Sequence, residues 1–344
     1  MTSPDETLMR RALELGASVR LTTSPNPWVG SVVLAADGSL AGEGATAAPG
    51  GPHAEASALA SAGERARGGT CYSTLEPCTV TGRTGPCAEA LIAAGVRRVV
   101  IAVADPDDRV SGRGVARLES AGVEVTTGVL AAEASEQLRP YLVHRTTLRP
   151  YVVLKLATTL DGYIAAPDGS SKWITGEPAR ADAHRLRAES DAVLVGAGTV
   201  RADDPQLTVR LGPRAGQAAG ALGGVLASQP LRVVLGRAPE AARVRPAVEM
   251  TGDPRGVLDD LGRRGVLQLL VEGGSNVAAQ FHRLGLVDRY VLYLAPALLG
   301  GADGRSMFAG QGAGSMAEAW RGRLVGVLRL GEDIRVDVEA TGER

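Results

Sequence analysis

The chain has 344 residues, the length of about two domains of ordinary size. Its 37 basic and 38 acidic side chains leave a net charge of −1, which argues against a general polyanion-binding protein. Hydrophobic residues make up 44%, enough for packed cores, whereas 3% aromatic residues leave little material for stacking nucleic-acid bases. Three cysteines are too few for a disulfide scaffold and fit metal chemistry in a reducing compartment. An acidic N-terminus and the lack of 18 consecutive apolar residues predict neither a signal peptide nor a membrane span.

Helical and strand patterns alternate from the start of the chain to about residue 145. Apolar spacing or a high content of Ala and Leu predicts helices at Thr7–Leu15, Ala54–Ala62 and Ala88–Ala94, the last of them capped by Gly95. Short apolar runs rich in Val and Thr predict strands at Ser31–Ala35, Thr70–Thr74 and Val99–Val103. Strands that follow helices in this way predict an α/β layer structure with parallel pairing.

A change of character around Arg139–Pro150 predicts a linker, after which a second α/β pattern begins. We expect a helix at Ala179–Ala188 and strands at Tyr151–Leu156, Ala192–Val195, Arg232–Leu235, Leu267–Val271 and Tyr290–Leu294. Residues Gly212–Gln229 are rich in Gly and Ala without periodicity and predict a flexible surface loop. The sequence thus predicts two domains, residues 1–146 and 147–344.

A histidine and two cysteines in the first domain have the character of zinc ligands. His53 opens a predicted helix, Cys78 follows a predicted strand and Cys87 follows a proline. One imidazole and two thiolates suit Zn²⁺ and leave a fourth position for water, whose pKa a bound zinc lowers from 15.7 towards roughly 7. Glu55, two residues after His53, can face that water and pass its proton to a departing amine. The pattern predicts a catalytic zinc site of the deaminase type.

The spacing of the cysteines narrows the class. Cys78 and Cys87 are nine positions apart, whereas nucleic-acid deaminases use C-x-x-C. With Ser24-Pro25-Asn26-Pro27-Trp28-Val29-Gly30, Gly50–Glu55 and Thr74–Cys78, the first domain resembles the deaminase half of the bifunctional deaminase/reductase family of riboflavin biosynthesis. The resemblance implies a cytidine-deaminase-like three-layer domain, in which Asn26 contacts the pyrimidine and Arg83 helps to hold the ribotide phosphate.

The second domain carries glycine-rich turns after apolar strands, which let a backbone approach phosphate groups closely. The runs Lys155–Gly162, Gly169–Gly176, Val195–Val200 and Val271–Asn276 together resemble the reductase half of the same family, whereas a G-x-G-x-x-G fingerprint is absent. The resemblance implies a dihydrofolate-reductase-like fold and an NADPH cofactor held by Ala157, Trp173, Thr199, Asp203 and Gly274. It also implies a ribotide held by Ser171, Arg187, Leu207, Arg210 and Glu272.

The leading hypothesis is a bifunctional enzyme of riboflavin biosynthesis. It would deaminate 2,5-diamino-6-ribosylamino-4(3H)-pyrimidinone 5′-phosphate and then reduce the ribosyl group to ribityl with NADPH. Two departures support an alternative, a paralogue whose deaminase pocket is retuned or inactive. The family usually has histidines where this chain has Ala45 and Val80.

Two further hypotheses belong to other classes. A zinc-stabilised binding module would not need Glu55, and a nucleic-acid deaminase disagrees with the charge, the aromatic content and the cysteine spacing. We therefore expect small pyrimidine ribotides as partners, with no nucleic acid and no membrane. The family resemblance implies a cytoplasmic homo-oligomer.

Overall fold

The computed structural model describes residues 3–80, 85–210 and 229–341. These residues form two compact units, which meet in the chain at Leu148 and Arg149. Each unit has its own sheet and its own hydrophobic core. Among the described helices, none combines the length and the apolar character needed to cross a bilayer.

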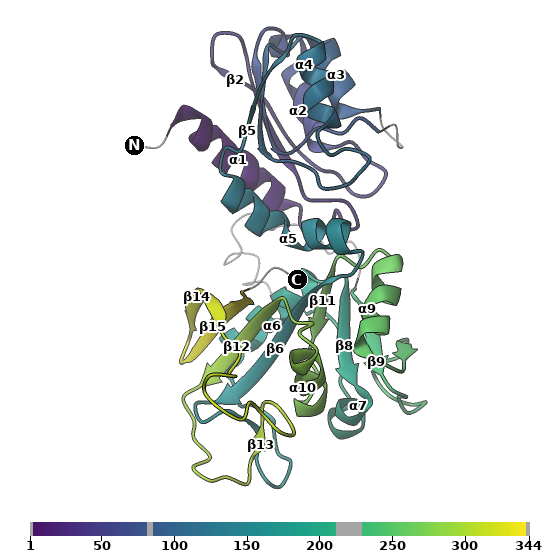
Figure 1. Ribbon diagram of the computed structural model, residues 1–344, viewed down its shortest axis with the longest axis vertical. Coiled ribbons are helices and arrows are strands. Elements are labelled where there is room, and N and C mark those ends of the chain that lie inside the picture. The colour runs from purple at the N-terminus through teal and green to yellow at the C-terminus, as the bar shows by residue number, and fades with distance from the viewer. Residues whose placement is uncertain (1–2, 81–84, 211–228, 342–344) are drawn as a thin grey trace. The chain divides into compact units, whose positions relative to one another are not determined.

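The first unit is built on a five-stranded sheet in the order β2-β1-β3-β4-β5 (Figure 1). Strands β3, β4 and β5 are parallel, whereas β1 is antiparallel to both β2 and β3. The strands are β1 (Gly30–Leu34), β2 (Leu40–Ala45), β3 (Thr70–Leu75), β4 (Arg98–Val103) and β5 (Glu124–Thr127). The expected parallel pairing is therefore right for the second half of this sheet and wrong for its first half, because the short β1–β2 connection forms a hairpin.

Helices cover both faces of this sheet and make three layers. One core joins α2, α3 and α4 to side chains such as Val33 and Ile101, and the other joins α1 and α5 to Val32 and Val100. Neighbouring residues of one strand thus point into different cores, as the pleat requires. The helices are α1 (Pro4–Ser18), α2 (Ala54–Ala62), α3 (Cys87–Ala94), α4 (Arg113–Ser120) and α5 (Ala131–Thr147), with a 3₁₀ turn η1 (Gly63–Ala66) after α2.

The second unit contains an eight-stranded sheet in the order β10-β9-β8-β11-β6-β12-β15-β14 and a small β13-β7 pair. Neighbours from β10 to β12 are parallel, and the C-terminal strands β15 and β14 add to the edge antiparallel. The parallel strands are β6 (Tyr151–Thr159), β8 (Ala192–Gly196), β9 (Leu231–Leu235), β10 (Val248–Met250), β11 (Gln268–Val271) and β12 (Arg289–Ala295). The others are β7 (Tyr163–Ala165), β13 (Arg305–Ser306), β14 (Gly322–Leu330) and β15 (Asp333–Ala340).

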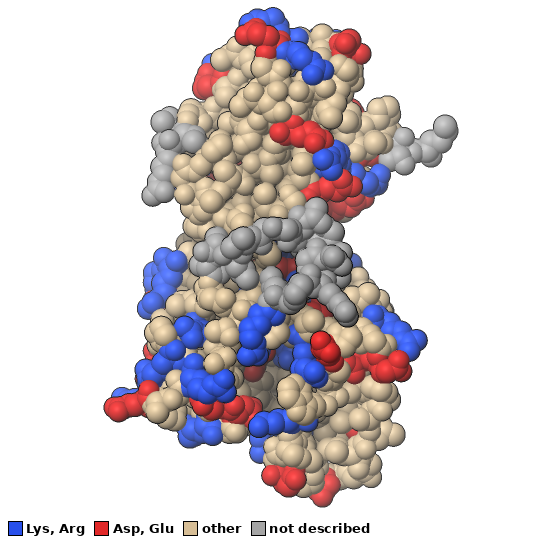
Figure 2. Space-filling view, turned by 180° about the vertical axis from the view of Figure 1, so that it is seen from behind, with Lys and Arg blue, Asp and Glu red and all other residues tan. Residues whose placement is uncertain are grey.

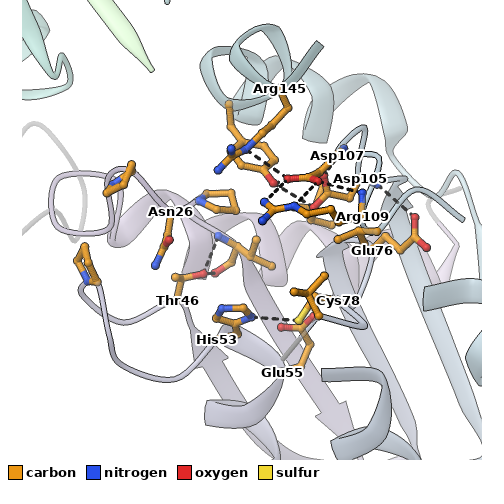
Figure 3. A pocket seen from close by; sticks show the side chains of 18 of the residues that line it. Asn26, Thr46, His53, Glu55, Glu76, Cys78, Asp105, Asp107, Arg109 and Arg145 are labelled. Carbon is orange, nitrogen blue, oxygen red and sulfur yellow. Dashed lines mark hydrogen bonds and ion pairs between the residues drawn. The ribbon is translucent and has the colours of Figure 1, made fainter. Parts of the chain in front are cut away.

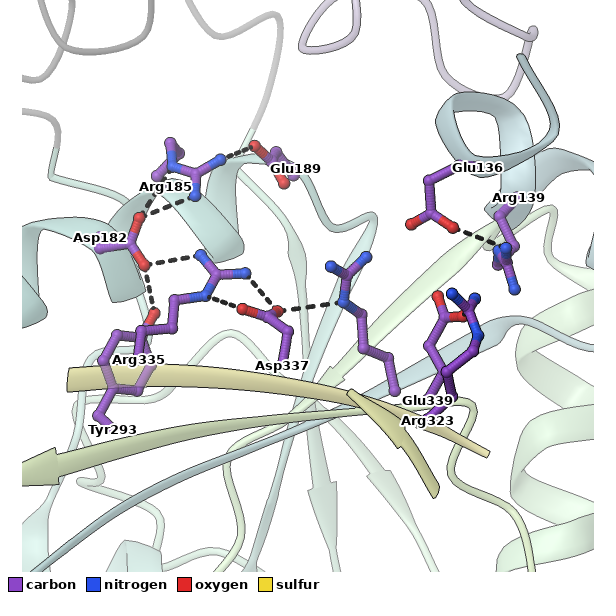
Figure 4. A network of polar contacts seen from close by, with 11 residues as sticks. Glu136, Arg139, Asp182, Arg185, Glu189, Tyr293, Arg323, Arg335, Asp337 and Glu339 are labelled. Carbon is purple, nitrogen blue, oxygen red and sulfur yellow. Dashed lines mark hydrogen bonds and ion pairs between the residues drawn. The ribbon is translucent and has the colours of Figure 1, made fainter. Parts of the chain in front are cut away.

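Helices α6 (Glu177–Ala188), α7 (Ala197–Asp203), α9 (Pro254–Arg263) and α10 (Ser275–Arg283) connect these strands. Apolar side chains of α9 and α10, among them Leu258 and Phe281, pack on β6, β8 and β11. Helix α6 buries apolar side chains such as Leu186 and is also joined to the sheet by charges: Arg335 of β15 lies 2.7 Å from Asp182 and 2.7 Å from Asp337 (Figure 4). The hydroxyl of Tyr293 donates a further hydrogen bond of 2.7 Å to Asp182, so the buried ions satisfy one another.

Most helices and strands expected from the sequence are present with ends shifted by a few residues. Helix α2 has the expected bounds, and Gly95 ends α3 with a left-handed φ of 70°. The expected loop at 212–229 lies outside the described residues except for Gln229. The linker expected at Arg139–Pro150 is wrong up to Thr147, because those residues continue helix α5. Further elements that the sequence reasoning missed are α4, α7, α9 and α10 and the strands β2, β5, β7, β10, β13, β14 and β15.

Candidate functional site

The three expected metal ligands come together from separate elements of the first unit. His53 is the residue before α2, Cys78 follows β3, and Cys87 begins α3. The close approach of β2 to α2 fixes the start of that helix. A Cβ on Gly44 would lie 2.4 Å from the carbonyl oxygen of Ala54, so only glycine fits there.

The geometry of this triad fits a zinc ion. Nδ1 of His53 lies 3.6 Å from Sγ of Cys78 and 3.3 Å from Sγ of Cys87. Tetrahedral zinc with ordinary bond lengths places a sulfur and a nitrogen ligand about 3.5 Å apart. Within the described residues, this is the one group of His, Cys and acidic side chains close enough to share an ion. Three protein ligands leave one position for water or substrate, as in catalytic zinc sites.

Glu55 lies beside the triad in the first turn of α2. Its side chain lines the same cavity as His53 and Cys78, but it is not one of the grouped ligands. The residue is 4% exposed, and burial raises the pKa of the carboxyl to about 7. A carboxyl group held beside the ligands can accept and release a proton close to the reacting atoms.

The cavity around the triad has a volume of about 520 Å³. Asn26 lines it, as expected for a residue that contacts the pyrimidine (Figure 3). Thr46 and Val80 line it too, so the valine in place of a family histidine faces the substrate space. Arg83 lies outside the described residues.

Several residues of this cavity were missed by the sequence reasoning. They come from the loop after β4 and from α5, and they are Asp105, Asp107, Arg109, Tyr141 and Arg145. Strands β3 and β4 are parallel neighbours, so the residues that follow them share one edge of the sheet. The acidic run Asp105-Pro106-Asp107-Asp108 directly after a predicted strand was therefore a usable signal. Helix α5 also had a usable signal, since Ala131–Leu138 is rich in helix formers and Ala134, Leu138 and Tyr141 stand at helical spacing.

The second unit has its own cavity of about 400 Å³ beside the carboxyl ends of β8 and β11. All five expected cofactor contacts line it: Ala157, Trp173, Thr199, Asp203 and Gly274. Ser171 and Glu272, expected to contact the ribotide, line it too. The hydroxyl of Thr199 accepts a hydrogen bond of 3.2 Å from the backbone N–H of Gly274 and so ties two of the turns together.

A buried ion cluster closes one side of this cavity. Nε and Nη2 of Arg187, on α6, both donate to the carboxylate of Glu272, and the Nη2 distance is 2.8 Å. Nζ of Lys155 lies 3.9 Å from the same carboxylate. Burial alone would raise the pKa of Glu272, but the neighbouring cations outweigh it and lower the pKa to about 2. Burial lowers the pKa of Lys155, which makes its proton easier to give up.

Leu207 and Arg210 lie apart from the described lining of this cavity. Leu207 is buried with a φ of 53°, an unusual conformation for a leucine. The backbone N–H of Arg210 donates to Nδ1 of His184 at 3.2 Å, on the same helix as Arg187. Their contact with a ribotide stays a prediction.

Two family models match the chain. The cytidine and deoxycytidylate deaminase zinc-binding region matches residues 2–103, and the RibD C-terminal domain matches residues 150–336. Curated relatives carry the name riboflavin biosynthesis protein RibD. The protein of Escherichia coli K12 is 38% identical, over 96% of this chain and 98% of its own length. The protein of Mycobacterium tuberculosis H37Rv is 42% identical, over 96% of each chain.

Solved structures agree with these matches. RibD of Acinetobacter baumannii, form 1, superposes with a TM-score of 0.90 at 38% identity and covers 98% of this chain and 99% of its own. A deaminase/reductase from Thermotoga maritima superposes with a TM-score of 0.87 at 34% identity, with the same coverage. The expected pairing of a cytidine-deaminase-like unit with a dihydrofolate-reductase-like unit is confirmed.

Fold and sites define a zinc-dependent deaminase joined to an NADPH-dependent reductase in one chain. The chain belongs to the RibD family of bifunctional deaminase/reductases of riboflavin biosynthesis. The comparisons support the bifunctional hypothesis and give no support to a paralogue with a retuned or inactive deaminase.

Proposed function

We propose that the first unit deaminates a 2,5-diamino-6-ribosylamino-4(3H)-pyrimidinone 5′-phosphate and that the second reduces the ribosyl group of the product to ribityl. One observation carries the deaminase half: three zinc-type ligands and a buried carboxyl group meet at a cavity of nucleotide size. The retained Glu55 also favours catalysis over a binding module, because a structural zinc site needs no proton carrier.

Proton handling in the deaminase falls to Glu55. A zinc ion held by His53, Cys78 and Cys87 supplies a Lewis acid that activates water at neutral pH. Glu55 accepts a proton as the water oxygen bonds to the carbon that carries the 2-amino group. It then delivers that proton to the departing nitrogen. The amino group leaves as ammonia, and the water oxygen stays on the carbon. Asn26, on the wall of the same cavity, would hold the pyrimidine ring in the orientation that this attack requires.

In the reductase, the chain positions the sugar while NADPH supplies the hydride. Hydride addition at C1′ breaks the bond from C1′ to the ring oxygen, and that oxygen needs a proton. Lys155 is largely but not fully buried, lines the cavity and holds a proton that burial makes easier to release. We assign that protonation to Lys155, with Glu272 and Arg187 as the groups that orient it.

The experiment follows ammonia release from the diaminopyrimidinone ribotide by the zinc-loaded chain, and then NADPH oxidation at the nicotinamide absorbance band. Both signals in that order support the proposal. NADPH oxidation only with the deaminated ribotide, and no ammonia release, would instead favour a retuned deaminase, for which Ala45 and Val80 are the observed departures.

We also propose a homo-oligomer that works in the reducing cytoplasm on small molecules. The edge strand β14 exposes Leu324 and Val327 on one face, an apolar surface suited to a second copy of the chain. Free thiols at Cys78 and Cys87 suit a reducing compartment. On the face drawn in Figure 2, basic and acidic side chains are interspersed within each unit, unlike the basic band of a nucleic-acid-binding protein. Sedimentation of the chain and of a Val327→Lys variant tests the association.

A further inference from the structure

The deaminase cavity carries a pair of arginines that the chemistry described above does not use. Among its described lining residues, only Arg109 and Arg145 carry a permanent positive charge. Their side chains are 67% and 28% exposed, whereas Glu55 is 4% exposed. In Figure 3, Asp105, Asp107, Arg109 and Arg145 gather on one side of the cavity, with His53 and Cys78 on the other.

Asp107 fixes the two guanidinium groups relative to each other. Nε of Arg109 donates to Oδ1 at 2.9 Å and Nη2 donates to Oδ2 at 2.7 Å, which leaves Nη1 outside the pair. Nε of Arg145 lies 3.9 Å from Oδ2, too far for a hydrogen bond, and its guanidinium stands 5.1 Å from the ring centre of Tyr141. Asp105 lines the same part of the cavity and interacts electrostatically with both arginines, so two aspartates stand beside the two guanidinium groups. Nη1 of Arg109 lies outside these pairs and is a donor for a further anion.

The loop after β4, which carries Asp107 and Arg109, is held in place by hydrogen bonds to Glu76. The buried carboxylate of Glu76, two residues before Cys78, accepts hydrogen bonds from the backbone N–H groups of Asp105, Gly112, Gly114 and Val115. The Tyr141 hydroxyl donates to Asp105 at 3.0 Å, which ties α5 to the same loop. The Glu76 carboxylate therefore connects the metal-ligand loop to the loop of Asp107 and Arg109, and the cluster is organised before a ligand arrives.

We propose that Arg109 and Arg145 bind the phosphate monoester of the deaminase substrate. The inference rests on the proposed function, since it takes the substrate to be a pyrimidine ribotide. A ribotide presents its amino group at one end and a phosphate with a charge of about −2 at the other, which matches a cavity with a buried proton carrier and guanidinium donors at a more exposed part of its lining. Guanidinium groups suit phosphate oxygens in geometry and charge.

This subsite explains how the cavity can hold a ribotide without the two histidines that the family usually has. Val80 lines the cavity and offers no hydrogen bond, and Ala45 has only a methyl group. The guanidinium donors of Arg109 and Arg145 would replace that polar contact, and Asp107 between them reduces their mutual repulsion when no ligand is bound.

Steady-state ammonia release from the ribotide and from its dephosphorylated riboside tests the proposal in the zinc-loaded full chain. Arg145→Gln and Arg109→Gln should each raise KM for the ribotide by about 10- to 100-fold, the range expected for one charge-assisted contact, with kcat nearly unchanged. Neither variant should alter kcat/KM for the riboside. Arg139→Gln on the same helix, with a side chain 33% exposed and paired to Glu136, is the matched control and should behave as the parent chain.

Calorimetric titration with ribose 5-phosphate gives a readout that does not depend on turnover. The parent chain should show two classes of site, and the Arg109→Gln, Arg145→Gln double variant should lose one of them. If the parent chain releases no ammonia from the ribotide but the double variant still loses one class of ribose 5-phosphate site, the subsite is upheld and the proposed deaminase substrate is refuted. An unchanged ribotide KM in both variants, with Arg83→Gln alone raising it, would overturn the subsite.

Discussion

Replacing Glu272 by Gln should destabilise the reductase unit and stop its chemistry. The side chain of Glu272 is 8% exposed and is the shared anion of Arg187 and Lys155, whose side chains are 16% and 19% exposed. The amide keeps the shape but removes the charge, so two buried cations lose their partner. Breaking a buried ion pair from one side costs about 3–5 kcal/mol of unfolding free energy. For a unit of this size, that loss lowers Tm by about 6–20 °C.

Differential scanning calorimetry measures this change, with the reductase transition identified as the one that NADPH shifts upward in the parent chain. Glu332→Gln is the matched control, because Glu332 pairs with Arg329 while both side chains are more than 70% exposed. Its Tm should stay within about 2 °C of the parent value. A Glu272→Gln chain as stable as the control, with full NADPH oxidation, would refute the role given to the buried ion cluster.

Three further predictions concern single groups. Glu55→Gln should abolish ammonia release, because Glu55 moves protons and does not hold the metal. Zinc content and NADPH oxidation on the deaminated ribotide should stay at parent levels. Loss of zinc from this variant would contradict that role. Lowering the pH from about 4.5 to 2 should destabilise the reductase unit of the parent chain more than that of Glu272→Gln. The pKa of Glu272 is lowered to about 2 in the folded chain, so its stabilisation is complete above its ordinary value of 4.5 and is lost as the pH falls through 2; parallel acid-unfolding curves would contradict this. Gly114→Ala should weaken zinc binding and deamination, because its Cβ would lie 2.1 Å from the carbonyl oxygen of Pro77, next to Cys78. Gly256→Ala, with open space around the new Cβ, is the control and should be tolerated. Equal zinc affinity in both variants would argue against a link between Gly114 and the metal ligands.

The local sequence was enough to predict many of the helices and strands and the chemistry of the triad His53, Cys78 and Cys87. The functional residues stand at the start of a helix or just after a strand, and they are His53, Glu55, Cys78 and Cys87. At such positions the residue type itself indicates a metal ligand or a proton carrier. Helix α2 was predicted with the correct ends because its Ala and Leu content is typical of a helix throughout.

Periodicity could not supply the partners of these residues. Arg145 reaches the deaminase cavity because α5 packs on the face of the sheet opposite α2, and its distance in sequence from Asp107 gives no sign of this. Strand β15 pairs antiparallel with β12, and its Arg335 contacts Asp182 of α6, more than 150 positions away in the chain. Sequence alone therefore determined which atoms can react. The tertiary structure decided which charges surround them, because electrostatic contacts depend on distance in space and leave no local pattern in the chain.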